Sequence, residues 1–188
     1  MKIKIGFFLI LPVMLLLVGC YKQAPRASLS APGDVRVVAM NAPAPHGNEV
    51  DLIVMTHIKK PSYLLNPRTP ETPYTFTLSI DGAKFVETVT GREQTRSLSM
   101  DERGRGIHYV LKKRLRVKPG TYEISLKAED GASARVTGKF RSGDIYTVRF
   151  DPVYGPRRFL RPKHFEKGLI DFSVNLSVRN FEEDELLD

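Results

Sequence analysis

The stretch YTFTLSI, residues 74–80, decides the fold class of this chain. Large apolar side chains alternate along it with small hydroxyl side chains, which is the pattern of a β-strand with one buried face. Asp81-Gly82 follows at once and is a strong signal for a tight hairpin turn. Residues 83–89 alternate less regularly and are expected to form the partner strand.

The same period of two recurs on both sides of this hairpin. The segments that show it are residues 107–117, 122–128, 134–140, 146–150 and 170–178. Residues 35–40 and 50–58 are more continuously apolar, which is typical of strands at the centre of a sheet. Lys113 interrupts the apolar row of residues 107–117, so we expect a bulge or a sheet edge there.

These segments amount to about eight or nine short strands, with turn signals every 8–12 residues or so. No window shows a sustained helical stripe, and the connections are too short for helical crossovers. The pattern predicts an all-β fold, an antiparallel β-sandwich that is immunoglobulin-like or a similar Greek key, over residues 35–180. Residues 181–188 read as an acidic C-terminal tail.

Lys118-Pro119-Gly120-Thr121 is a candidate type II turn, because proline presets φ and glycine accepts a positive φ. The surrounding stretch, residues 115–131, resembles the hairpins of immunoglobulin-like and PEGA-like bacterial surface modules, in which two strands flank Pro-Gly-Thr-Tyr. The resemblance covers under a tenth of the chain. It implies a β-hairpin within a surface module.

The first 19 residues have the pattern of a signal peptide. Lys2 and Lys4 precede an apolar run over residues 5–18. At 1.5 Å per residue a helix of that length spans ~21 Å, which is shorter than the ~30 Å hydrocarbon core of a bilayer. The run is therefore predicted to be a leader and not a permanent membrane span.

The end of the leader, Leu17-Val18-Gly19-Cys20, resembles the lipobox of bacterial lipoproteins, and Cys20 is the only cysteine in the chain. The resemblance implies cleavage between Gly19 and Cys20, a diacylglyceryl thioether on Cys20, and acylation of the new amine. Two or three acyl chains hold a protein stably at a membrane, whereas one does not. The membrane is thus the predicted partner of Cys20.

Residues 20–34 are rich in Ala, Ser and Pro and are predicted to be a tether. A flexible linker of this length has an r.m.s. reach of ~20 Å, so the folded domain would stay close to the membrane. In enterobacterial lipoproteins an Asp after the lipidated cysteine favours the inner membrane. Tyr21 stands at that position, so the resemblance favours the periplasmic face of the outer membrane.

The chain has 188 residues and a formal net charge of +8, and removal of Lys2 and Lys4 with the leader lowers the charge to +6. Two runs, residues 103–118 and 155–167, are basic and contain almost no acidic residue. Lys112, Arg114 and Arg116 would project from one face of a strand. The second run is expected to be a long, proline-braced loop.

These runs supply the candidate anion-binding residues, which are Arg103, Arg105, Lys112, Arg114, Arg116, Arg157, Arg158, Arg161 and Lys163. The anions that an exported protein meets are lipid phosphates, lipopolysaccharide and acidic glycans, whereas nucleic acid is not an expected partner. The other interpretation is that the charges solvate a strand edge and a loop.

The sequence singles out no catalytic residue, and no cofactor is predicted. It contains no GxSxG, SxxK or phosphate-binding glycine motif. The four histidines, His46, His57, His108 and His164, show no HExxH or HxH spacing, so no metal site is predicted either. A single cysteine excludes an intramolecular disulfide and any multi-cysteine metal site.

The leading hypothesis is therefore a membrane-anchored envelope lipoprotein whose β-sandwich is a non-enzymatic binding or structural module. The first alternative is a module that binds anions through its basic runs. The second is an envelope hydrolase or assembly enzyme that uses carboxylates the sequence does not identify. Two or more acids clustered with a histidine in a deep pocket would favour the enzyme, whereas a shallow basic face or an exposed sheet edge would favour binding.

Overall fold

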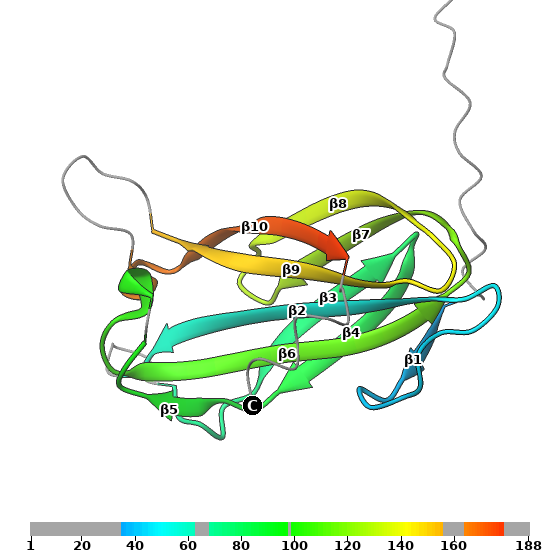
Figure 1. Ribbon diagram of the computed structural model, residues 1–188. Coiled ribbons are helices and arrows are strands. Elements are labelled where there is room, and N and C mark those ends of the chain that lie inside the picture. The colour runs from blue at the N-terminus through cyan, green and yellow to red at the C-terminus, as the bar shows by residue number, and fades with distance from the viewer. Residues whose placement is uncertain (1–34, 63–67, 98, 156–163, 179–188) are drawn as a thin grey trace, which may run out of the picture.

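The computed structural model describes residues 35–62, 68–97, 99–155 and 164–178, which form a sandwich of two β-sheets (Figure 1). One sheet has the strand order β1-β6-β2-β9-β10, with β5 also paired to β6, and the other has the order β4-β3-β7-β8. The strands are β1 Arg36–Val38, β2 Val50–Pro61, β3 Tyr74–Ile80, β4 Ala83–Val89, β5 Arg92–Gln94, β6 Gly106–Val117, β7 Gly120–Ala128, β8 Ser133–Phe140, β9 Ile145–Tyr154 and β10 Leu169–Val178. Two short 3-10 turns, η2 Met100–Glu102 and η3 Phe165–Lys167, complete the described elements.

The all-β sandwich is confirmed, although its pairing is not purely antiparallel. The central strand β2 pairs antiparallel with β6 but parallel with β9. Among the described residues no α-helix is present, so none could cross a membrane as a long apolar helix. The immunoglobulin-like strand order stays a prediction.

The stretch YTFTLSI forms β3 with the expected faces. Its large side chains, Tyr74, Phe76, Leu78 and Ile80, are fully buried between the sheets. Asp81 and Gly82 have φ values of 46° and 87°, the positive pair that a two-residue hairpin turn needs to match the twist of its strands. The β3–β4 hairpin is thus specified locally, by alternation followed by the turn.

Lys113 marks neither a bulge nor an edge. The register of β2 with β6 is continuous from Val50 opposite Val117 to Pro61 opposite Gly106. Lys113 instead occupies an inward position of β6, where it pairs with Glu87 and lies 5.4 Å from the centre of the Phe85 ring. A long side chain can cross apolar surface in this way and keep its ammonium at the edge of the core.

The stretch at residues 115–131 is not a single hairpin. β6 and β7 belong to different sheets, so residues 118–119 carry the chain from one layer of the sandwich to the other. Gly120 is absent from the residues with positive φ, which excludes the predicted type II turn. The hairpin in this region joins β7 to β8 through Gly131, whose φ is 99°.

Residues 35–40 also differ from the prediction, because β1 is a three-residue edge strand and not a central one. It pairs only with one end of β6, and Val37 is 54% exposed. The central position belongs to β2, in which eight of the twelve residues are buried, as its apolar run predicts.

Candidate functional site

The outer face of the larger sheet carries two polar clusters, one near each end of β2. Side chains alternate along a strand, so Asp51, His57 and Lys59 share the face of β2 that points away from the core. The register places Arg116 opposite Asp51 and His108 opposite Lys59. The fold therefore brings together polar residues that lie about fifty or more positions apart in the chain.

The first cluster is built around Asp51, which is fully buried. Its carboxylate accepts hydrogen bonds from Nε of Arg114 at 2.7 Å and from Nε of Arg116 at 2.6 Å. Both guanidiniums also donate to carbonyl oxygens of the segment that follows β1: Arg114 to Met40, Ala42 and Pro43, and Arg116 to Pro43. Asp51 and the two arginines thus fasten residues 40–43 onto the sheet.

Burial by itself would raise the pKa of Asp51, but the hydrogen bonds and charges of Arg116 and Arg114 outweigh it. The net result is a lowered pKa, so the carboxylate is ionised at neutral pH. The cluster is a buried, hydrogen-bonded ion triad.

This arrangement bears on the predicted basic stripe of Lys112, Arg114 and Arg116. Arg114 and Arg116 do share a face with Lys112, but Arg114 is only 5% exposed and its guanidinium is held by Asp51 and three carbonyl groups. Arg116 is likewise paired with Asp51 and Glu49. Both guanidiniums are thus engaged by groups of the protein itself.

Of the remaining candidates for anion binding, the three in the described part of the chain have different surroundings. Arg105 pairs with Glu93, Lys112 is exposed on β6, and Arg103 lines the pocket described next. Arg157, Arg158, Arg161 and Lys163 lie outside the described residues. The first basic run is therefore divided between an internal ion triad and separate surface charges.

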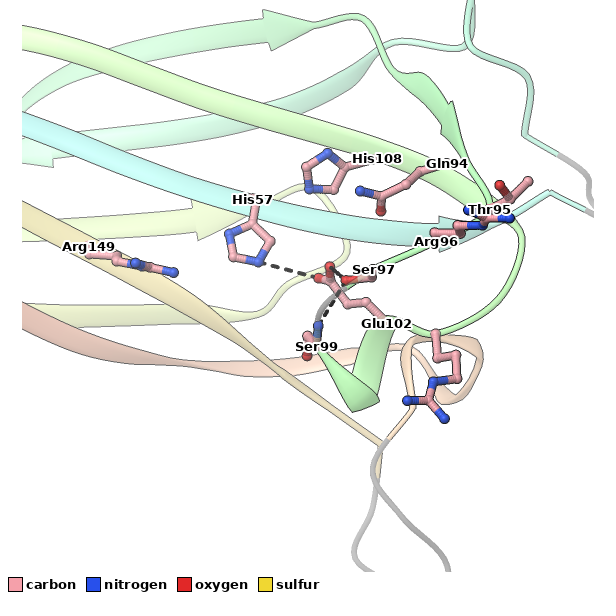
Figure 2. A pocket seen from close by; sticks show the side chains of 10 residues that line it. His57, Gln94, Thr95, Arg96, Ser97, Ser99, Glu102, His108 and Arg149 are labelled. Carbon is pink, nitrogen blue, oxygen red and sulfur yellow. Dashed lines mark hydrogen bonds and ion pairs between the residues drawn. The ribbon is translucent and has the colours of Figure 1, made fainter. Parts of the chain in front are cut away.

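The second cluster lies in an open pocket of about 850 Å³ beside η2 (Figure 2). This volume falls in the range of small-molecule sites. The pocket is lined by His57, Gln94, Thr95, Arg96, Ser97, Ser99, Glu102, Arg103, His108 and Arg149. Arg149 of β9 reaches the pocket because the parallel pairing places it opposite Met55 of β2.

Three of these side chains converge in the pocket (Figure 2). Nε2 of His57 lies 3.5 Å from Oε1 of Glu102, and the rings of His57 and His108 have their centres 5.5 Å apart. One nitrogen of each histidine and one carboxylate oxygen all lie within 4.8 Å of one another. Both histidines are half-buried, whereas Glu102 is 3% exposed.

Two buried side chains, those of Tyr154 and Lys59, hold Glu102 in place by hydrogen bonds. The hydroxyl of Tyr154 donates to Oε1 of Glu102 at 2.8 Å and accepts from the backbone N–H of Lys59 at 2.7 Å. The ammonium of Lys59, which is fully buried, donates to the carbonyl oxygens of Glu102 and Gly104 at 2.8 and 2.6 Å. These bonds fix η2 and its carboxylate against β2 and β9.

The surroundings shift the pKa values of three groups at this site. Burial lowers the pKa of His108, and the charges of His57 and Lys59 act in the same direction, against the charge of Glu102. Burial likewise lowers the pKa of Lys59, and burial together with the nearby Glu102 raises that of Tyr154. At neutral pH His108 is thus a neutral imidazole, with a nitrogen lone pair to offer.

Sequence reasoning missed this site. His57 and His108 are 51 positions apart and acquire their proximity from the β2–β6 register, which no local motif encodes. Glu102 sits in a three-residue 3-10 turn and carries no signal at all in the sequence. Gln94, Arg96 and Arg149 line the pocket and were also not singled out. The one usable signal was the position of His108 on the outward face of a predicted strand.

Comparison of the chain with protein-family models, with curated proteins and with solved structures finds no match.

We expect Tyr154→Phe to lower the free energy of unfolding by about 1–3 kcal/mol, because the backbone N–H of Lys59 and the carboxylate of Glu102 both lose a buried partner. Urea denaturation followed by far-UV circular dichroism measures the loss. Tyr122→Phe is the matched control, since its hydroxyl donates to one carbonyl, that of Lys118, away from the pocket. A smaller loss for Tyr154→Phe than for Tyr122→Phe would contradict the assigned role.

Proposed function

We propose that this protein is a bacterial envelope lipoprotein, anchored through Cys20, whose β-sandwich is a non-enzymatic binding module. The pocket on the outer face of the larger sheet is its ligand site. The observation that carries the proposal is the lipobox, in which the only cysteine of the chain stands where the motif requires it. The Pro- and Ser-rich tether that follows supports a domain displayed close to a membrane.

The composition of the pocket gives no support to hydrolysis by a pair of carboxylates. Among its lining residues Glu102 is the one carboxylate, and the pocket is open. Glycoside hydrolysis, for example, uses a pair of carboxylates that flank the scissile bond. Asp51, the other fully buried acid among the described residues, is enclosed by Arg114 and Arg116 at the far end of β2.

Tyr21, in place of Asp after the lipidated cysteine, supports the periplasmic face of the outer membrane as the location. The partner is then an envelope protein or another envelope component that reaches the outer face of the larger sheet. An extended anion-binding surface has less support, because Arg114 and Arg116 are paired with Asp51.

Cys20→Ala tests the anchor. We expect it to abolish incorporation of a labelled fatty acid and to leave residues 1–19 attached, because the thioether must form before the leader is removed. Metabolic labelling and intact-mass analysis of the membrane fraction give the readout. Tyr21→Ala, one position beyond the motif, should keep full labelling. Detection of a free Cys20 thiol on a chain that retains its leader would refute the anchor in the unaltered protein.

A further inference from the structure

We infer that His57, Glu102 and His108 form a binding site for a divalent transition-metal ion such as Zn²⁺. The inference deepens the proposed function and rests on it, because it names the ligand of the proposed pocket. Two imidazoles and one carboxylate are a donor set that zinc uses when a fourth position is left open for water or another ligand.

The geometry is close to what zinc requires. Bonds of ~2.0–2.1 Å in a tetrahedron place neighbouring ligand atoms about 3.3 Å apart. Nε2 of His57 and Oε1 of Glu102 are already separated by 3.5 Å. The whole set lies within 4.8 Å, so the two ligand atoms that stand farthest apart must approach each other by roughly 1.5 Å when the ion binds.

Neighbouring residues hold the three proposed ligands in place, as they do in known protein metal sites. Metal-ligating groups are usually oriented by hydrogen bonds from a second layer of residues. Here Tyr154 donates to the ligating oxygen of Glu102, and Lys59 holds the backbone of the same residue. Both histidines project from β2 and β6, two long strands in continuous register, so their backbones are fixed. A site on rigid strands keeps its geometry better than one on loops.

The open side of the site faces the rest of the pocket. Oε1 of Gln94 lies there, buried and without a hydrogen-bond partner among the described residues, and it can accept from a metal-bound water. Arg96, Arg103 and Arg149 line the same pocket. Their charges oppose a bare cation and favour an ion whose fourth ligand is an anion.

The test is titration of the full, untagged chain in detergent with ZnCl₂, at neutral pH and without phosphate or chelator, followed by calorimetry. The absence of a tag matters because an oligohistidine tag would itself bind the probe. We expect one saturable site per chain. His57→Gln, His108→Gln and Glu102→Gln should each weaken binding by roughly a hundredfold or more, beyond the roughly 10–100-fold that loss of a second-layer group causes.

His46→Gln is the matched control, because His46 is exposed and outside the cluster. It should bind zinc as the unaltered chain does. Zinc should also raise the unfolding temperature of the unaltered chain and of His46→Gln but not of the three ligand variants, a readout that compares each variant with itself.

Absence of a saturable site in the unaltered chain, or equal affinity in all the variants, would overturn the inference. Zinc that fails to bind while Cys20 still carries lipid would remove the metal site and leave the anchor standing. Zinc binding by a chain that lacks lipid on Cys20 would remove the anchor and leave the metal site standing.

Discussion

Asp51→Ala is expected to destabilise the domain by about 3–5 kcal/mol, the cost of removing one partner from a buried ion pair. The substitution leaves Arg114 and Arg116 as neighbouring cations with little access to water, since their side chains are 6% and 11% exposed. It also weakens the attachment of residues 40–43, because both arginines would turn away from carbonyls they now bind. Chemical denaturation at neutral pH gives the loss in free energy of unfolding.

Glu49→Ala is the matched control for this result. Glu49 pairs with Arg36 and Arg116 but is one-third exposed, so its removal should cost less than about 1 kcal/mol. Similar losses for the two variants would show that the Asp51 triad is no more than a surface pair.

The Asp51 triad also predicts a pH dependence. Because the pKa of Asp51 is lower in the folded protein than its usual value of 3.8, protons bind first to the unfolded chain as the pH falls. The stability due to Asp51 is therefore complete above about pH 4 and is lost as the pH falls toward the folded-state pKa. The difference between the unaltered chain and Asp51→Ala should shrink over that range. A constant difference down to the acid transition would contradict the lowered pKa.

Phe172→Ala is expected to cost about 3–5 kcal/mol, as large-to-small aromatic changes in cores do. Phe172 is 5% exposed and packs edge-to-face on Phe150 of the adjacent strand, with ring centres 6.3 Å apart. Because β10 is an edge strand with a single hydrogen-bonded neighbour, loss of this ring also weakens its attachment to the sheet. The chain has no Trp, so urea denaturation is best followed by far-UV circular dichroism.

Ile170→Ala on the same strand provides the comparison. Ile170 is 51% exposed, and we expect its truncation to change the free energy of unfolding by no more than about 0.5 kcal/mol. Equal losses at residues 170 and 172 would mean that β10 packs with a different register from the one described.

Residues 170 and 172 also show where the alternation of apolar residues predicts burial correctly and where it does not. The period of two predicted residues 170–178 as one amphipathic strand, and Phe172 is inside as expected. A register shift between Leu169 and Asp171 then turns Leu169 inward and leaves Ile170 outside. A bulge is set by the partner strand as much as by the strand itself, and a single sequence does not reveal it.

The sequence pattern predicted β2 and β3 best, because β2 has a long apolar run, β3 has an alternating one, and both strands contribute buried side chains. It was weakest for polar groups. The sequence showed Arg114 and Arg116 as charges on one face but not that Asp51 would lie between them, since that depends on which strand pairs with β6. The His57–Glu102–His108 cluster depends on the same pairing and on the path of η2. Long-range register, and not local propensity, decides these contacts.

The parallel pair of β2 and β9 has a consequence for how the protein matures. These neighbours are separated by about ninety residues of chain, and Thr56 of β2 donates its hydroxyl proton to the carbonyl of Phe150 across that separation. Contacts so distant in sequence raise the contact order and slow folding. Synthesis runs from the N-terminus, so β2 is made well before β9. The larger sheet can therefore be completed only after most of the polypeptide has been made, because β9 and β10 are its last strands in the sequence.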